Sequence, residues 1–544
     1  MWQHAHARAD ADIAALPSAP PALAERPLLH FITCGSVDDG KSTLLGRLLH
    51  DVQAVSDDQQ GVLTADSKRF GTTGDAPDFA LLLDGLEAER EQGITIDVAY
   101  RYFATGRRAF IVADTPGHEQ YTRNMVTGAS SADLAVILVD ASQGVVRQTR
   151  RHSAIVRALG VRHVVLAINK MDLVEFAQTR FAALVDEYAA LAATIGIEAF
   201  TAIPVVARDG DNVVRRSART PWYAGPTLIA TLETAAPPSR ASTAPMAMAV
   251  QRVSRPDARF RGYAGRIAAG QLRPGQRLRV LPSGASATVA RIVAAEGDRA
   301  HAAAGESVML TFAEAIDCAR GDVIVAPEAE VGVASALDAT LIWLDTAPLD
   351  VTRRYLLKLG TRTIRARVAE IGERFDPETG EHHATSKIAC NDLARGRIAL
   401  DRPVAADLYG RSRTLGGFIL IDPVTNATVA AGLVTAIHAA SGREQRRAQL
   451  YRLDAATSAI EPLAARAEAL LRAGGAPAAA ITSATIERVR TAAVQGQTAV
   501  RDVLAELLRE AGVAVILADA DPSAPGKRLT PDEVEAGLGG GWVI

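Results

Sequence analysis

Two glycines, a lysine and a serine near the start of the chain have a spacing that suits phosphate binding. Gly35, Gly40, Lys41 and Ser42 lie between an apolar run and the helical pattern of residues 43–49. Glycines let the backbone curl so that successive N–H groups and a helix N-terminus face one anion, while the lysine reaches the β- and γ-phosphates and the hydroxyl ligates Mg²⁺. We therefore expect a loop that binds a nucleoside triphosphate. Its binding residues are expected to be Gly35, Ser36, Val37, Asp38, Asp39, Gly40, Lys41, Ser42 and Thr43.

A carboxylate and a second hydroxyl follow at positions suited to the same metal. Asp114 comes directly after the apolar run 108–113, and the end of such a strand would place its carboxylate beside the loop. Thr95 lies between the loop and this strand, where a segment that orders on the γ-phosphate must supply a hydroxyl. The sequence thus predicts that Ser42, Thr95 and Asp114 hold Mg²⁺, with Gly117 at the switch that follows.

A third motif concerns the base of the nucleotide. Asn169, Lys170 and Asp172 end the buried-strand run 164–168. A carboxylate accepts hydrogen bonds and donates none, so it can pair with the N1 and N2 donors of guanine, whereas adenine offers no matching donors. The nucleotide is therefore expected to be GTP, and the chain a switch GTPase.

Each of these residues has an ordinary interpretation when it is taken alone. Asp172 could cap a helix, Thr95 could be a strand threonine and His118 could be a surface histidine. Their order, each at the end of a strand, favours one nucleotide site, because ligands of open parallel sheets gather at the carboxyl ends of strands. His118 follows Gly117, where translational-type GTPases place the residue that orients the attacking water. The expected catalytic residues are therefore His118, Lys41 and Thr95.

Length and composition bound the remaining possibilities. A chain of 544 residues suggests roughly three or four domains. A net charge of −3 gives no general basic field, so we expect no nucleic-acid partner, and the basic runs 147–151 and 443–447 are expected to be solvated helix faces. Three scattered cysteines fit the cytoplasm, and Cys34 is expected to be a packing residue. No apolar stretch reaches the ~20 residues of a membrane helix, so no membrane association is expected.

The fold class follows from the alternation of patterns along the chain. We expect an α/β phosphate-loop GTPase domain, then two β-barrel domains, then a small C-terminal α/β domain. A helical spacing around Leu504 and a buried-strand run at 513–517 indicate the last of these. The expected limits are 1–27 for a flexible extension, 28–236 for the GTPase domain, 241–330 and 334–434 for the barrels, and 440–544 for the last domain.

With these motifs in place, the chain resembles the GTP-hydrolysing large subunits of bacterial sulfate adenylyltransferase, which are similar in architecture to elongation factor Tu. The resemblance rests on residues 31–48, 87–100 and 114–128 and covers roughly residues 28 to 434. It implies a GTPase that drives a small catalytic subunit, subunit 2, in a heterodimer or a higher assembly. That partner makes adenylyl sulfate and pyrophosphate from ATP and sulfate during sulfate assimilation.

The sequence departs from this family in two places. The guanine-bracing Ser-Ala-Leu motif reads Val206-Ala207-Arg208, so a hydroxyl is missing, although the Ala207 N–H that would meet guanine O6 remains. Many relatives carry an adenylyl-sulfate kinase after the barrels, but residues 435–544 contain no phosphate loop. We interpret this part as either a degenerate kinase-like domain without activity or an unrelated appendage that packs or docks.

An alternative function is a translation-type GTPase that delivers an RNA-bound cargo, because the same three-domain plan would suit it. The acidic charge balance and the Asp38-Asp39 pair in the loop favour the sulfate-activating function.

Overall fold

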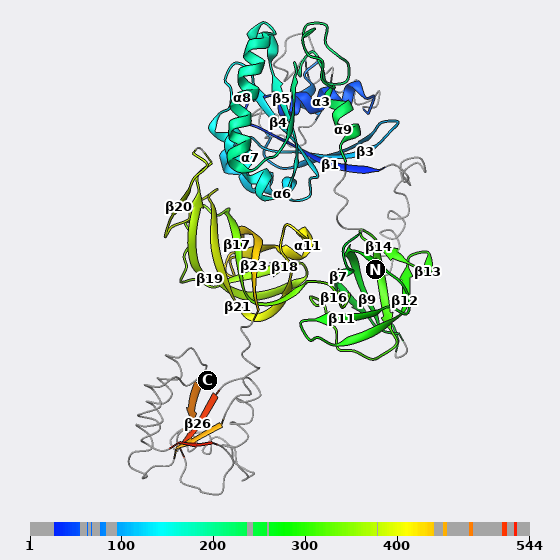
Figure 1. Cartoon of the computed structure of the whole chain (residues 1–544), viewed down its shortest axis with the longest axis vertical. Helices are drawn as coiled ribbons and strands as arrows, with labels where there is room; N and C mark the ends of the chain where they lie inside the picture. The colour runs from blue at the N-terminus through cyan, green and yellow to red at the C-terminus, as the bar shows by residue number, and fades with distance from the viewer. Residues whose placement is uncertain are drawn as a thin grey trace, which may run out of the picture. The chain divides into compact units, whose positions relative to one another are not determined.

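The computed structural model describes residues 27–54, 63, 67, 77–82, 95–236, 243–257, 260–377 and 379–439, and the backbone of four later strands (Figure 1). Contacts divide the chain into two compact units, residues 1–440 and 441–544, and each is described by itself.

The first domain is built on a six-stranded sheet in the order β2-β3-β1-β4-β5-β6, in which β2 is antiparallel to β3 and the other pairs are parallel. Its strands are β1 (Leu28–Cys34), β2 (Ala99–Ala104), β3 (Ala109–Asp114), β4 (Leu134–Asp140), β5 (His163–Asn169) and β6 (Phe200–Pro204). The helices are α3 (Lys41–Asp51), α6 (Thr122–Ser130), α7 (Arg147–Ala158), α8 (Gln178–Ile195) and α9 (Leu228–Thr234), with 3₁₀ turns η1 (Phe79–Leu82), η2 (Glu119–Tyr121) and η3 (Met171–Val174).

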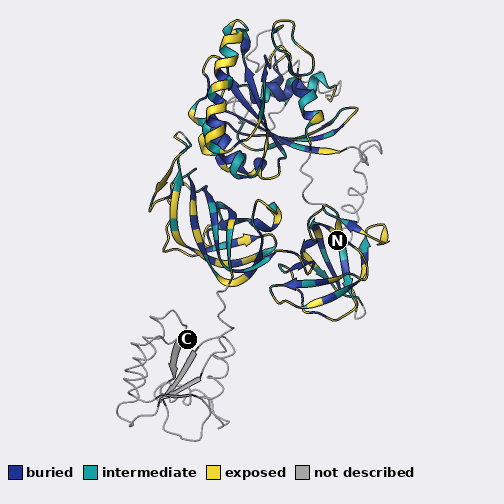
Figure 2. Cartoon of the chain, in the orientation of Figure 1, coloured by how far each residue is buried: buried dark blue, intermediate teal, exposed yellow. Residues whose placement is uncertain are grey.

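The apolar runs of this sheet are buried on both faces, which explains why they do not alternate with polar residues. Every residue of β4 is buried (Figure 2). Successive side chains of a strand point to opposite faces, so Phe31 packs into the core that contains Leu44 of α3, while Ile32 packs into the core that contains Met125 of α6 and Ile155 of α7. Two helical layers therefore hold the sheet and the ends of its strands in place.

The next two domains are closed β-barrels. In the second domain the pairing runs β11-β16-β7-β9-β15-β12 and returns to β11, and in the third it runs β18-β22-β23-β17-β21-β19 and returns to β18. The second domain contains β7 (Ala247–Ala249), β8 (Arg252–Ser254), β9 (Gly262–Ala269), β10 (Gln271–Leu272), β11 (Arg277–Leu281), β12 (Ser286–Ala294), β13 (Gly297–Arg299), β14 (Ala302–Ala303), β15 (Ser307–Phe312) and β16 (Val323–Val325). The third contains β17 (Gly332–Trp343), β18 (Tyr355–Leu359), β19 (Arg362–Phe375), β20 (His382–Ala384), β21 (Leu393–Ala406), the short helix α11 (Arg413–Gly416), β22 (Gly417–Ile421) and β23 (Thr428–Ala439).

The last strand of the third domain is longer than its apolar run suggested. β23 pairs with β17 as far as Ala439, opposite Ala334. The expected domain limit at residue 434 therefore falls inside a strand that closes the barrel. The prediction ended too early because polar residues such as His438 interrupt the apolar run at the outer end of β23.

The second unit contains a four-stranded parallel sheet in the order β25-β26-β24-β27. These strands are β24 (Leu450–Leu453), β25 (Ala478–Ile481), β26 (Ala514–Ala518) and β27 (Lys527–Leu529). The strand expected at 513–517 is thus present as β26. The expected helix around Leu504, the N-terminal extension and the basic run 443–447 lie outside the described residues.

Candidate nucleotide-binding site

The residues expected to bind the nucleotide come from the carboxyl ends of three parallel strands. The loop 35–40 joins β1 to α3, Asp114 ends β3 and Asn169 ends β5. Because β1 pairs with β3 and β4, and β4 pairs with β5, these ends lie along one edge of the sheet. Residues far apart in the sequence are thereby brought to one place.

The phosphate loop is tightly folded around its own charged groups. Gly40 has φ +85, which favours glycine, and directly precedes α3. The Lys41 ammonium donates to the Ser36 carbonyl at 2.6 Å, and the Asp39 carboxylate accepts from the Ser36 N–H at 2.5 Å. Burial raises the pKa of Asp39 to about 6. The Lys41 ammonium and the Ser36 N–H are thus bonded within the loop, and a bound phosphate would take the place of these partners.

Gly117 packs directly against this loop. A Cβ at this position would lie 2.5 Å from the Lys41 Nζ and 2.7 Å from the Ser36 carbonyl carbon. A side chain here would therefore displace the lysine, which explains why the turn after Asp114 carries a glycine.

Ser42, Thr95 and Asp114 converge as the sequence predicted. The Ser42 Oγ lies 2.9 Å from Oδ2 of Asp114 and 3.2 Å from the Thr95 Oγ1. Thr33 donates to the other Asp114 oxygen at 2.7 Å, which fixes the carboxylate. Two hydroxyls and a carboxylate are hard oxygen donors, so this set fits Mg²⁺.

The charges beside these oxygens are buried. Burial raises the pKa of Asp114, and its hydrogen bonds with Thr33 and Ser42 and the Lys41 charge oppose that rise. Burial lowers the pKa of Lys41, and Asp114 and Asp39 oppose that change. The lysine and the carboxylates therefore stabilise one another's charged forms in a place with little water.

His152 of α7 is a site residue that the sequence did not reveal. It is fully buried, and its Nδ1 accepts the Gly35 N–H at 3.3 Å while its Nε2 lies 2.8 Å from the Gln148 amide. Burial, together with Lys41 and Arg151, lowers the pKa of His152 to about 3, so the ring is neutral and can accept this bond. Inside a helical pattern, a single histidine carries no signal of such a contact.

The Asn169 side chain connects the phosphate loop to the base-binding loop. Its amide donates to the Asp39 carbonyl at 2.7 Å, and its oxygen accepts the Ala207 N–H at 2.9 Å. Lys170 forms an ion pair with Asp140 at 2.9 Å. These contacts fix the backbone on which a guanine would rest.

Asp172 lies in the first turn of η3, where Arg208 approaches it. The Arg208 guanidinium is 3.5 Å from its carboxylate. The relatives' motif has leucine at this position, so the substitution brings a cation to the expected base-binding acid. Arg208 is more than half exposed, so the pair contributes at most about 1 kcal/mol.

His118 lies half-buried at the N-terminus of η2. Its Nδ1 accepts the Gln120 N–H at 3.3 Å, and its ring centroid lies 6.0 Å from that of Tyr121. Its contacts are thus within its own turn, and its expected role beside the γ-phosphate stays a prediction.

The third-domain barrel contacts the turn that carries His118. The Asn391 amide donates to the Glu119 carbonyl at 3.0 Å, and Arg151 pairs with the Glu119 carboxylate. The expectation that residues 147–151 form a solvated face is therefore wrong for Arg151, which is 8% exposed because its helix faces this turn. Arg147 is exposed and Arg150 pairs with Glu187.

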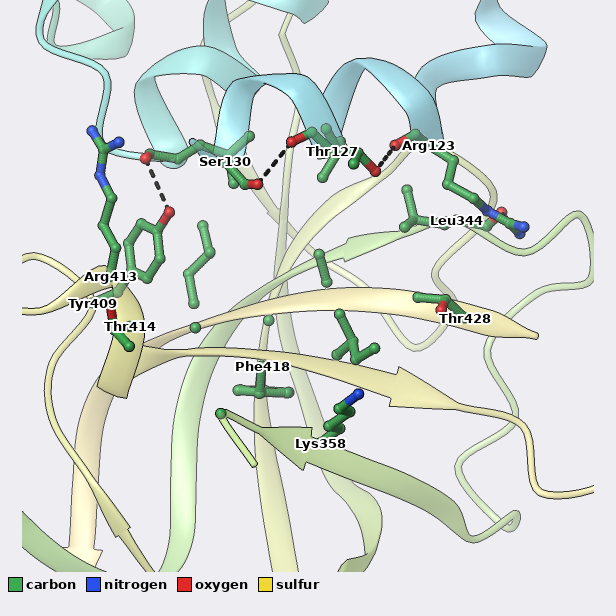
Figure 3. Close-up of a pocket in the computed structure, with 18 residues that line it drawn as sticks. Arg123, Thr127, Ser130, Leu344, Lys358, Tyr409, Arg413, Thr414, Phe418 and Thr428 are labelled. Carbon is green, nitrogen blue, oxygen red and sulfur yellow. Dashed lines mark hydrogen bonds between the residues drawn. The ribbon is translucent and has the colours of Figure 1, made fainter. Parts of the chain in front are cut away.

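A cavity of about 590 Å³ lies where α6 faces the third-domain barrel (Figure 3). Arg123, Thr127 and Ser130 line it from α6, and Lys358 and Phe418 line it from β18 and β22.

Hydrogen bonds from the barrel close this seam. Tyr409 donates to the Leu159 carbonyl at 3.0 Å, and Arg413 donates to the Ala132 and Gly160 carbonyls at 2.7 and 2.6 Å. These bonds hold the segments that follow α6 and α7, and α6 itself contacts the barrel where Arg123 donates to the Leu344 carbonyl at 3.3 Å.

Two further expectations can be compared with the structure. Cys34 is buried in β1, and burial raises its pKa to about 12, which fits a packing residue. Among the described residues, no helix combines the length and apolar character needed to cross a bilayer.

Comparisons with known proteins agree with this geometry. The elongation factor Tu GTP binding domain family matches residues 26–245, and the GTP-eEF1A C-terminal domain-like family matches residues 336–435. The chain is 48% identical over 435 residues to sulfate adenylyltransferase subunit 1 of Tolumonas auensis, covering 80% of this chain and 92% of the relative. It is 50% identical over 416 residues to a protein of that name from Methylorubrum extorquens, with 76% and 89% covered. It is 54% identical over 417 residues to the bifunctional enzyme CysN/CysC of Xylella fastidiosa, with 76% and 67% covered.

Proposed function

The chain belongs to the sulfate adenylyltransferase subunit 1 family, and we propose from that premise that it hydrolyses GTP to drive a separate catalytic subunit. That partner, the small subunit 2, makes adenylyl sulfate and pyrophosphate from ATP and sulfate. The observation that carries the proposal is the convergence of Ser42, Thr95 and Asp114 beside a phosphate loop that Asn169 ties to the base-binding loop.

We assign the site residues as the sequence predicted. Residues 35–43 hold the phosphates through backbone N–H groups and Lys41. Asp172 accepts the guanine N–H donors, and the Ala207 N–H meets O6. Ser42, Thr95 and Asp114 would hold Mg²⁺, which when bound neutralises charge on the β- and γ-phosphate oxygens.

Hydrolysis then needs a positioned water and a stabilised leaving charge. Lys41 is buried, so its ammonium acts on the developing β/γ charge without competition from bulk water. His118 turns from its own η2 contacts to orient the attacking water. The Thr95 hydroxyl lies beside Ser42, so the segment before β2 would be linked to the γ-phosphate through the metal, which makes hydrolysis depend on the switch.

Coupling to the partner runs through the third-domain barrel in this proposal. The formation of adenylyl sulfate is strongly uphill because it contains a phosphate–sulfate anhydride, so it must be linked to a second hydrolysis. α6 contacts the barrel where Arg123 bonds Leu344, and η2 does so where Asn391 bonds Glu119, so these two contacts would carry a change at the γ-phosphate to the barrel. We place the assembly in the cytoplasm as a heterodimer or a higher assembly.

Reconstitution with a small subunit tests this function. The two proteins are co-expressed and purified, and adenylyl sulfate is measured from ATP and sulfate with GTP, with GDP and without nucleotide. We expect co-purification and GTP-dependent synthesis, and Lys41→Ala in the large subunit should abolish both GTP hydrolysis and the stimulation. Synthesis that proceeds equally without GTP, or Lys41→Ala turnover near that of the wild type, would contradict the proposal.

A further inference from the structure

A cleft of about 560 Å³ lies where the second-domain and third-domain barrels meet, away from the nucleotide-binding site. Four of its eight lining residues are arginines: Arg320, Arg362, Arg365 and Arg402. Thr361 and Thr363 also line it, and Asp401 is its one carboxylate. This polar lining differs from that of an ordinary small-molecule pocket, which is mostly apolar.

The alternation of β19 explains the positions of these side chains. Ile364, Ala366 and Val368 point into the barrel core, so Thr363, Arg365 and the next outward residue, Arg367, lie on the outer surface.

The cleft is held in shape by contacts between the two barrels. Thr361 donates to the Val250 carbonyl at 2.7 Å, and Arg362 forms a 3.8 Å ion pair with Asp322 of the second domain. Within the second domain, Arg320 donates to the Gln251 carbonyl at 3.1 Å. Gly321 has φ +97, and a Cβ there would lie 2.8 Å from the Arg362 Cδ. The arginines therefore come from fixed backbone positions on two domains, which lowers the entropic cost of binding a ligand.

The charges of the cleft are poorly neutralised within the protein. Arg362 has only a long ion pair, 3.8 Å from Asp322, and Asp401 is paired at 3.2 Å with Arg354 outside the cleft. Within the part of the chain that the structure describes, Arg365 and Arg402 have no ion-pair partner. Like charges are thus gathered in one concave place in a chain whose net charge is −3, and an anion would relieve their repulsion.

We propose that this cleft is a binding site for a diphosphate group, supplied either by free pyrophosphate or by the phosphate chain of a nucleotide. The planar guanidinium fork binds phosphate oxygens in pairs, and hydroxyls complete such a shell. Four arginines exceed what a single small oxyanion can contact in pairs, whereas two linked phosphates can use them. The site is separate from the GTP site, so its failure would leave the proposed function untouched.

Calorimetric titration at low salt tests the proposal, with GDP saturating the GTP site. The probes are inorganic pyrophosphate, ATP, sulfate, a 20-nucleotide RNA and polyglutamate. We expect pyrophosphate to bind, and Arg365→Ala and Arg402→Ala each to weaken it by about tenfold or more, since each removes a charge-assisted pair of bonds. Arg367→Ala is the matched control, because Arg367 is exposed on the same face of β19 but does not line the cleft, and it should change the affinity by less than about twofold.

The results distinguish free pyrophosphate from a nucleotide as the ligand, and both from an acidic protein or an RNA. Tighter binding of ATP than of pyrophosphate, with the same two variants weakened, assigns the diphosphate to a nucleotide. No binding at millimolar pyrophosphate, or sulfate binding as tightly as pyrophosphate, would overturn the proposal. So would polyglutamate binding more tightly than pyrophosphate, or preferred RNA binding that all three variants weaken, because these results indicate an acidic protein partner or an extended nucleic-acid surface. Unchanged GTP hydrolysis and circular dichroism confirm that each variant is folded.

Discussion

Lys41, Asp39 and Asp114 are buried together at the phosphate loop, and each charge depends on the others. Burial lowers the pKa of Lys41 and raises those of both acids, so an isolated member of the group would tend to become neutral. A bound phosphate and its metal would enter this balance of charges directly.

His118→Ala should slow GTP hydrolysis by about 100-fold and leave GTP affinity unchanged, because the proposed role concerns the water and not the phosphates. Single-turnover hydrolysis and nucleotide titration measure the two effects. A collapse of affinity with an unchanged rate per bound nucleotide would show that this role is wrong.

Asp172→Asn should change the preferred nucleotide from GTP to xanthosine triphosphate. The amide can donate to the second base carbonyl, whereas the carboxylate could only accept from the guanine amino group. A buried group left unpaired is costly, so the change in preference could reach about 10⁴-fold. Competition between the two nucleotides measures it, and a variant that still prefers GTP would mean that the base is recognised elsewhere.

His152 predicts a pH dependence of stability. Its pKa is about 3 in the folded protein, against 6.5 for an unburied histidine, so the unfolded state binds the extra proton first as pH falls. Stability is therefore lost as the pH falls from 6.5 towards 3, by roughly 2 kcal/mol at pH 5.

Urea unfolding at pH 7 and pH 5 measures this effect against His152→Gln, which keeps a hydrogen-bonding side chain but does not titrate. The variant should lose about 2 kcal/mol less than the wild type over this range. Equal losses in both proteins would rule out the buried neutral histidine.

At the scale of elements, the loop before β21 contacts η2. Asn391 adopts φ +67 and donates to the Glu119 carbonyl, one residue after His118. The third-domain barrel thus reaches the turn that carries the proposed catalytic residue.

Asn391→Gly should slow GTP hydrolysis by about tenfold at unchanged GTP affinity. The change removes one hydrogen bond, about 1 kcal/mol, while glycine still permits the left-handed backbone. Asn426→Gly is the control, since Asn426 has φ +58 in the same barrel but lies in the turn between β22 and β23. Equal rates in both variants would mean that the barrel does not position this turn.

At the scale of the whole molecule, the second unit can be removed without cutting the barrel only beyond β23. Truncation after residue 440 should preserve GTP hydrolysis and GTP-dependent adenylyl sulfate synthesis, because the cut leaves β23 paired with β17 up to Ala439. Truncation after Gly432 should destabilise the third domain, because it removes the outer half of β23. Comparing both truncations in the reconstituted assay and by thermal unfolding checks this expectation.

The full-length chain should also make no 3′-phosphoadenylyl sulfate from ATP and adenylyl sulfate, since residues 441–544 have no phosphate loop. Detecting this product in the full chain, and losing it on truncation, would contradict the view of the second unit as catalytically inactive.

The phosphate loop, the base-recognition motif, the two barrels and the family could all be predicted from the sequence, because each has a characteristic spacing of residues. A loop such as 35–43 binds phosphate through consecutive backbone groups, so its function can be predicted from a short run of consecutive residues. The carboxyl ends of parallel strands meet at one edge of the sheet, so Ser42 and Asp114 could be predicted to lie together, and Thr95 to join them as the hydroxyl of the segment that orders on the γ-phosphate.

Contacts between distant segments of the chain could not be predicted from the sequence and are seen in the folded structure alone. His152 meets Gly35 across 117 residues and Asn391 meets Glu119 across 272, and neither contact has a local pattern. Arg151 is buried although it belongs to a basic run that the sequence predicts to be solvated, since α7 faces η2 and Arg151 pairs there with Glu119. The arginine cleft exists because the two barrels bring exposed residues to one junction, where the Thr361 hydrogen bond to Val250 and the Arg362–Asp322 ion pair join the domains.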